Sequence, residues 1–302
     1  MAGLSPRAGQ FGGRSDCLDL VGLTPLMART SGRPEIPIAL IDGPVALDHP
    51  DLAAQNIREV PGKLPGVCAD AGDAACAHGT FIAGILAARR MSVAPAICPG
   101  CRLLVRPIFS EASVNDEQMP RASAGELADA IIDVIDAGAR VINLSVALQG
   151  PSARGGRSLQ EALDFALRRG IVVVAAAGNQ GAVGGSVITC HPWVIPVVAY
   201  DLRGRPMDLS NLGASIGRSG LGAPGEAVTS LGVTDPLTMG GTSAATPFVT
   251  GAVALTWSDF PDATAAEVRS AVTQAAAPRR TTIVPPLLSA WASYQTMSKA
   301  RS

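Results

Sequence analysis

Short apolar runs alternate with amphipathic helical patterns along most of this chain, and this alternation constrains the fold more than any other feature. The run at residues 171–177 is apolar on both faces of a strand, which is typical of the centre of a parallel sheet. Strands that alternate with helices of this length form βαβ units. The sequence therefore predicts an α/β fold with a mostly parallel central sheet covered on both faces. The expected strands are residues 36–41, 102–109, 140–145, 171–177 and 193–200, and the expected helices are residues 79–89, 125–137, 159–169, 243–258, 264–275 and 287–297.

The length of 302 residues, with 47% hydrophobic content, is enough for one large α/β domain. Residues 1–20 are rich in Gly, Ser and Arg, so we expect a flexible N-terminal segment there. No change of composition divides the remainder. We therefore expect residues 21–302 to form a single domain that includes a C-terminal helix.

The charge balance excludes several kinds of partner. The formal net charge is −1 and charged residues make up 16% of the chain, so bulk electrostatics would attract neither nucleic acid nor an anionic membrane. The longest apolar run, residues 171–177, is too short to span a bilayer. The N-terminus has no apolar signal region. We expect a cytoplasmic protein without membrane contact, and the alternative of a signal or pro-segment already removed stays open.

The six cysteines offer no complete metal site. Cys98-Pro-Gly-Cys101 has the spacing of a zinc or redox pair, but zinc needs four ligands and no second matched pair follows. Cys68 and Cys76 flank a short loop, and both a disulfide and free thiols are compatible with that spacing. We predict no metal and no other cofactor.

Three histidines compete for the role of a general base, and His78 is the best placed of them. His78 lies where a loop meets the helix expected at residues 79–89, so the ring would be held rigidly at a cleft. His49 lies in a polar turn, and His191 lies between a cysteine and a proline before a strand. Taken alone, any of the three is more often a packed or surface residue.

Ser243 lies at the start of an expected helix of small residues, in the segment Gly-Gly-Thr-Ser243-Ala-Ala-Thr-Pro. The two glycines before it permit a tight turn. The free N–H groups at a helix start would surround a nucleophile there and stabilise a tetrahedral oxyanion. In isolation, the same pattern is more often a helix cap.

Asp42 and Asn179 each follow an expected strand. The carboxylate of Asp42 is suited to accept a hydrogen bond from a histidine ring, and the amide of Asn179 is a neutral donor suited to an oxyanion. Each is otherwise a common turn residue. Asn143 is a rival donor, but it lies inside a strand and is expected to be structural. The order Asp42, His78, Ser243 is one of three known orders of a Ser-His-Asp triad.

From residue 36 to residue 275 the chain resembles the subtilases, the subtilisin-like serine proteases. The matching segments are Ile-Asp42-Gly-Pro-Val, His78-Gly-Thr-Phe-Ile-Ala-Gly, Val-Ile-Asn-Leu-Ser145, Ala-Ala-Gly-Asn179 and Gly-Thr-Ser243-Ala-Ala-Thr-Pro-Phe-Val. The resemblance implies a three-layer αβα sandwich and peptide-bond hydrolysis through an acyl-enzyme. It also implies an oxyanion hole at Asn179 and an edge strand, formed by Ser145, Val146 and Ala147, that pairs with the substrate backbone. Gly178 is expected to bind the substrate too, and residues 121–123 are expected to supply the opposite edge.

Departures from the family pattern qualify these expectations. Phe81 and Phe248 stand where many subtilases have histidine, and Ala147 replaces a common glycine, which narrows the expected S1 entrance. Residues 89–95 carry two arginines where secreted members have an asparagine-rich calcium loop, so we expect that calcium site to be absent.

Three segments are similar to those of the subtilases that mature cyanobactin-type precursor peptides: Asp42-Gly-Pro-Val, Ser243-Ala-Ala-Thr-Pro and Cys98-Pro-Gly-Cys-Arg-Leu-Leu-Val-Arg-Pro-Ile-Phe. Macrocyclising members carry a capping insertion, but only 36 positions separate Asp42 from His78. We therefore predict hydrolytic leader removal from a ribosomally made precursor peptide. Two alternatives remain: a broad-specificity degradative subtilase and an inactive peptide-binding scaffold.

Overall fold

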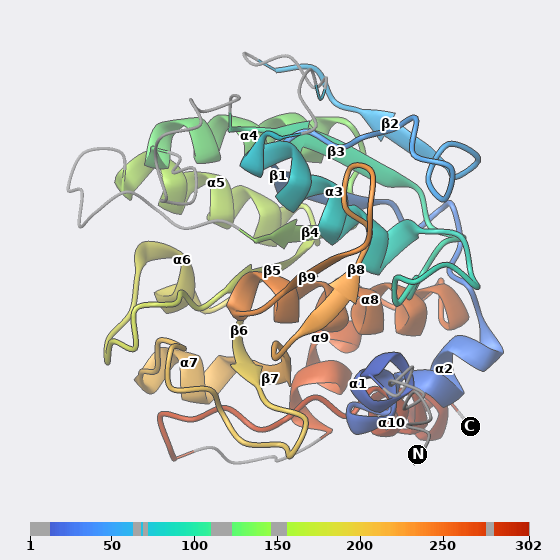
Figure 1. Cartoon of the computed structure of the whole chain (residues 1–302). Helices are drawn as coiled ribbons and strands as arrows, with labels where there is room; N and C mark the ends of the chain where they lie inside the picture. The colour runs from blue at the N-terminus through green and yellow to red at the C-terminus, as the bar shows by residue number, and fades with distance from the viewer. Residues whose placement is uncertain are drawn as a thin grey trace, which may run out of the picture.

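The computed structural model describes residues 13–62, 68, 72–109, 123–145, 156–275 and 281–301. A seven-stranded sheet runs through the molecule in the order β2-β3-β1-β4-β5-β6-β7, and every neighbouring pair is parallel (Figure 1). A small antiparallel hairpin, β8 with β9, lies outside it. The strands are β1 Ile38–Asp42, β2 Ile57–Glu59, β3 Leu103–Pro107, β4 Val141–Leu144, β5 Val172–Ala176, β6 Ile195–Tyr200, β7 Leu221–Pro224, β8 Val228–Ser230 and β9 Leu237–Met239.

The helices cover both faces of this sheet. They are α1 Gly13–Leu20, α2 Leu23–Arg29, α3 Ala74–Ala87, α4 Ala124–Asp136, α5 Gly156–Arg168, α6 Val187–Cys190, α7 Ala214–Ser219, α8 Thr242–Asp259, α9 Ala265–Gln274 and α10 Ala290–Ala300. The predicted α/β class is confirmed, and all five expected strands are present within one or two residues of their expected ends.

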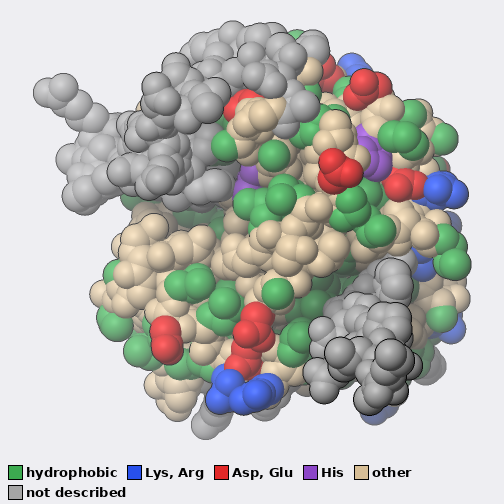
Figure 2. Space-filling model, in the orientation of Figure 1, with side chains coloured by type: hydrophobic (Ala, Val, Ile, Leu, Met, Phe, Trp, Pro, Cys, Tyr) green, Lys and Arg blue, Asp and Glu red, His purple; other side chains and the backbone are tan. Residues whose placement is uncertain are grey.

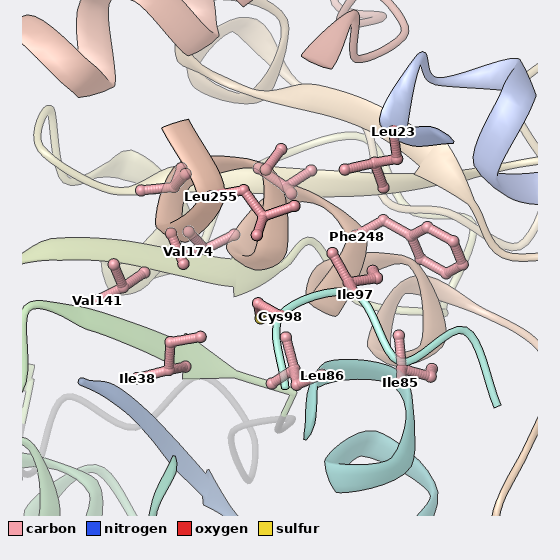
Figure 3. Close-up of a cluster of buried hydrophobic side chains, with 14 of the residues drawn as sticks. Leu23, Ile38, Ile85, Leu86, Ile97, Cys98, Val141, Val174, Phe248 and Leu255 are labelled. Carbon is pink, nitrogen blue, oxygen red and sulfur yellow. The ribbon is translucent and has the colours of Figure 1, made fainter. Parts of the chain in front are cut away.

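Alternate residues of the strands enter two different cores. Val172 and Val174 of β5 belong to the larger core, which α3 and α8 complete, whereas Val173 and Ala175 belong to the core under α4 and α5. This alternation explains why the strands are apolar at nearly every position. Figure 3 shows part of the larger core, to which helices, strands and the loop at Ile97 and Cys98 contribute side chains.

Helix α8 is the central helix of the larger core. Every residue from Thr242 to Ser258 is buried, and most of them are small. Small side chains let the neighbouring elements approach closely: a Cβ at Gly251 would lie 2.5 Å from Cγ2 of Ile97.

The N-terminal expectation needs correction. Residues 1–12 lie outside the described part, but residues 13–20 form α1 rather than a flexible segment. Cys17 and Leu18 are buried in the larger core, because α1 packs on α2 and on β8. Their apolar contacts outweigh the polar composition of the segment.

The cysteines are of two kinds in the structure, bonded and free. Cys68 and Cys76 are joined by a disulfide, whereas Cys98 and Cys101 are buried free thiols.

On the face shown in Figure 2, the charged side chains of the described residues are scattered, and positive and negative charges do not form separate patches. In the described segments, no helix has both the length and the apolar character needed to cross a membrane.

Candidate active site

Asp42 and His78 form a buried pair at the carboxyl end of β1. The Nδ1 atom of His78 lies 2.6 Å from Oδ1 of Asp42, and the same oxygen accepts a hydrogen bond of 2.7 Å from the Gly43 backbone N–H. The carboxylate is fully buried and the ring is 2% exposed. With Nδ1 donating to the carboxylate, Nε2 is left as the acceptor of the neutral ring.

Glycines allow α3 to lie directly on the chain that leaves β1. A Cβ at Gly43 would collide with the carbonyl oxygen of Ala75, and one at Gly79 would collide with that of Pro44. The helix begins at Ala74, five residues earlier than expected, because Asp73 caps it by accepting hydrogen bonds from the Ala75 and Cys76 amides. His78 therefore lies in the second turn of α3 rather than at a loop-to-helix junction.

Two opposed effects act on the pKa of His78. Burial disfavours the charged ring, but the charge of Asp42 and its hydrogen bond together outweigh burial and raise the pKa above its usual value. The Nε2 atom is buried and has no hydrogen-bond partner among the described residues. Such a nitrogen can accept a proton from a group that comes into contact with it.

Ser243 is the second residue of α8, and its neighbour Thr242 is held by the loop after β5. The preceding Gly241 has φ 104°, a conformation that favours glycine, and a Cβ there would lie 3.0 Å from Nδ2 of Asn179. Oδ1 of Asn179 accepts hydrogen bonds of 2.9 Å from both the backbone N–H and the hydroxyl of Thr242. The loop after β5 and the start of α8 are thereby fixed to one another.

The oxygen and the nitrogen of the Asn179 side-chain amide have different environments. Its oxygen is used by Thr242, but its Nδ2 donates to no described residue, and the side chain is exposed. Gly178, with φ 105°, donates from its backbone to the Thr242 hydroxyl at 3.2 Å. A donor with no partner among the described residues thus lies beside the first turn of α8.

Ser145 follows β4 and contacts Ser243 directly, through a 3.2 Å hydrogen bond from its hydroxyl to the Ser243 carbonyl. Val146 and Ala147, the other residues of the expected substrate edge, lie outside the described residues. Sequence reasoning missed this contact, and it also missed Thr242 as the partner of Asn179.

The other two histidines are engaged elsewhere. Nδ1 of His49 accepts a hydrogen bond from the Asp51 amide. Nε2 of His191 lies 3.2 Å from Oδ1 of Asp164, and its Nδ1 accepts from the Trp193 amide. Neither ring contacts Asp42.

Within the described segments, no group of three or more His, Cys, Asp or Glu side chains converges as metal ligands would. The loop after α3 instead carries two engaged cations. Arg89 binds Asp51 at 2.8 Å, and Arg90 donates to the carbonyls of Met27 and Ile97.

Known proteins resemble this chain in sequence over most of its length. A family model described as the subtilase family matches residues 34–291. Subtilisin DY of Bacillus licheniformis is 32% identical over 251 residues, which cover 80% of this chain and 83% of that protein. Subtilisin E of Bacillus subtilis strain 168 is 32% identical over 242 residues, and there the match spans 78% of this chain but 58% of the relative.

Solved structures show the same architecture. A mutant of the protease domain of PatA superposes with a TM-score of 0.79 at 30% identity, covering 89% of this chain and 97% of that one. The prenylagaramide maturation protease PagA gives 0.79 at 27% identity, covering 91% and 98%. The PatG macrocyclase in complex with peptide gives 0.78 at 20% identity, covering 91% and 95%, and shares the fold. The predicted subtilisin-like sandwich is confirmed.

Proposed function

This chain belongs to the subtilase family of serine endopeptidases, and from that premise we propose that Ser243, His78 and Asp42 form its catalytic triad. One contact carries the proposal: the buried 2.6 Å pair of His78 and Asp42, which leaves the His78 Nε2 atom without a partner among the described residues. Helix α3 packs against α8, the helix that carries Ser243.

The proposed reaction proceeds through an acyl-enzyme. The Ser243 hydroxyl attacks the scissile carbonyl while Nε2 of His78 takes its proton, and Asp42 stabilises the resulting imidazolium. The tetrahedral oxyanion receives a hydrogen bond from Nδ2 of Asn179. The imidazolium then protonates the leaving amine as the C–N bond breaks. The same ring then deprotonates a water molecule that attacks the ester carbonyl, and the imidazolium gives this proton to the Ser243 oxygen as the acyl C–O bond breaks.

We propose that the natural substrate is a ribosomally made precursor peptide, from which the enzyme removes a leader. The likeness to PatA and to PagA, a maturation protease, supports this substrate class. The substrate backbone would add to the edge formed by Ser145, Val146 and Ala147, with Gly178 as a further substrate-binding residue.

A cytoplasmic location is part of the proposal, and the Cys68–Cys76 disulfide weighs against it, because such bonds persist mainly in oxidising compartments. Alkylation of the protein in intact cells, followed by mass analysis without reduction, would measure the bond in place. Full alkylation of both thiols fits the cytoplasm, whereas protected thiols would overturn that location.

Labelling with a fluorophosphonate probe tests the triad. We expect the folded protein to be labelled on Ser243, and Ser243→Ala to abolish labelling while Ser215→Ala, a partly exposed serine on α7, retains it. Labelling that survives Ser243→Ala would overturn the assignment. Peptide binding without labelling or turnover would support an inactive scaffold instead.

A broad degradative role is the second candidate, and the identity with subtilisin DY favours it. Digestion of unfolded casein, compared with cleavage of a peptide library read by mass spectrometry, separates the two roles. Rapid unselective cleavage of casein would overturn the processing role, whereas cleavage restricted to few library sequences supports it.

A further inference from the structure

Helix α8 contains a proline at a position that affects the nucleophile. Pro247 lies four residues after Ser243, inside the helix. In an α-helix, the N–H of residue 247 would bind the carbonyl of residue 243, but proline has no N–H. The Ser243 carbonyl therefore lacks the hydrogen bond that holds an ordinary helical residue in place.

A side chain from β4 supplies the missing donor. The Ser145 hydroxyl donates to the Ser243 carbonyl at 3.2 Å, and Ser145 is almost completely buried. A buried carbonyl without a partner would be costly, so this hydroxyl stabilises the first turn of α8 where Pro247 cannot.

Two further residues fix the direction of the Ser145 hydroxyl. Nδ2 of Asn143 donates to Ser145 Oγ at 2.8 Å, and Oδ1 of Asn143 accepts from the Thr250 hydroxyl at 2.8 Å. An amide nitrogen can only donate, so Ser145 Oγ is the acceptor there and keeps its single hydrogen for the Ser243 carbonyl. We call Thr250, Asn143 and Ser145 the carbonyl relay.

The spacing of the two elements produces this relay. Asn143 and Ser145 are two residues apart, so both face α8 from the same side of the extended chain. Ser243 and Thr250 are seven residues apart, which is about two helical turns, so both face β4. The three relay side chains are at most 2% exposed and lie in otherwise apolar surroundings.

We propose that Asn143 and Thr250 are positioning residues, which hold Ser243 in register with the substrate-binding strand through the Ser145 hydroxyl. This inference rests on the proposed role of Ser243 as nucleophile. Since Ser145 also begins the substrate edge, one hydroxyl fixes the distance between the attacking residue and the strand that carries the peptide. A shift of about 1 Å between such groups lowers a rate by up to roughly 100-fold.

A matched pair of threonines on α8 tests the relay. Thr250→Val removes the relay hydroxyl without changing the side-chain shape. Thr256→Val removes another fully buried hydroxyl of the same helix, one that has no hydrogen-bond partner among the described residues. We expect Thr250→Val to lower kcat by roughly 10-fold or more with KM changed less than about two-fold. Thr250→Ser should restore kcat, and Thr256→Val should leave it unchanged.

The absent N–H of Pro247 provides a second test, which distinguishes positioning of Ser243 from a general contribution to stability. Ser145→Ala should lower kcat and slow fluorophosphonate labelling. Pro247→Ala returns an N–H to the Ser243 carbonyl, so Ser145→Ala should cost at least several-fold less in that background.

The outcomes separate the two proposals. If the parent protein is labelled on Ser243 but Thr250→Val and Thr256→Val have equal kcat, or if Pro247→Ala does not lessen the effect of Ser145→Ala, the relay is wrong and the triad stands. If the folded parent protein is not labelled on Ser243, the triad itself fails.

Discussion

Replacing Asp42 with asparagine isolates the charge of the proposed triad. Oδ1 of Asp42 accepts from both His78 Nδ1 and the Gly43 amide, whereas Oδ2 is buried without a partner among the described residues. In Asp42→Asn, the amide oxygen can keep both of these hydrogen bonds while the NH₂ group takes the place of Oδ2. The variant would thus keep the ring orientation and lose the negative charge.

The size of the effect follows from the geometry. With Nδ1 and Oδ1 2.6 Å apart, the centres of the two charged groups are about 4 Å apart. Unit charges at that distance attract by roughly 4 kcal/mol at an effective dielectric constant of about 20. The imidazolium forms in the transition state, so losing this attraction should lower kcat about 10³-fold. If the NH₂ group faces the ring and reverses its tautomer, the loss approaches about 10⁴-fold.

The pH dependence gives the sharper assay. Because Asp42 raises the pKa of His78, the acid limb of kcat/KM in the parent enzyme should lie above the ordinary histidine value of about 6.5. Burial alone remains in Asp42→Asn, so its limb should move to lower pH. The pair also stabilises the fold while His78 is protonated. That contribution is present below the unfolded-state pKa and is lost as the pH rises through the raised folded-state pKa.

A second histidine–aspartate pair supplies the control. Asp164 lies 3.2 Å from His191 Nε2 and is hydrogen-bonded to neither Asp42 nor His78. Asp164→Asn should leave both kcat and the acid limb unchanged. An acid limb that stays in place in Asp42→Asn would refute the assignment of His78 as the base controlled by Asp42.

Three further predictions follow from single contacts. Asn179→Asp keeps the oxygen that binds Thr242 but removes the free amide, so kcat should fall by about 10²- to 10³-fold with little change in KM; a change confined to KM would contradict the oxyanion role. Replacing both Cys68 and Cys76 with serine opens a short covalent loop and should lower the free energy of unfolding by about 2–3 kcal/mol in denaturant titration; an unchanged midpoint would contradict this stabilisation. A thiol reagent should modify exposed Cys190 rapidly in the folded protein and all four free thiols in denaturant, since burial raises the pKa of Cys17 to about 11 and also shields it; rapid modification of Cys17 in the folded state would show that α1 is not packed as described.

Strong periodicity made most of the sheet predictable. The strands β1, β3, β4, β5 and β6 lie in mostly apolar runs, and their ends fall within two residues of the predicted ones. Strand β7 was not expected, because Leu-Gly-Ala-Pro has little intrinsic strand preference and is held by its pairing with β6. Strand β2 is three residues long and lies at the edge of the sheet, too short for a periodic signal.

Helix ends were less predictable than helix cores. The start of α3, Ala-Ala-Cys-Ala, has no amphipathic period, and only the capping residue Asp73 marks it. Helix α1 combines glycine, serine and charged residues, so its composition indicates flexibility, whereas its packing on α2 and β8 decides the structure. Both differences are cases in which tertiary contacts outweigh local preference.

The two asparagines of the site show what position along the chain can and cannot indicate. Asn179 follows its strand, uses one end of its amide on Thr242 and leaves the donor end free, as an oxyanion donor requires. Asn143 lies within its strand, uses both ends of its amide on neighbouring side chains and is fully buried, so it is not placed to reach a substrate. Position relative to the strand end is the basis of the prediction that Asn179, rather than Asn143, donates to the oxyanion. It did not predict the consequence for Asn143, because that depends on Pro247, more than a hundred residues away, which leaves the Ser243 carbonyl in need of a donor.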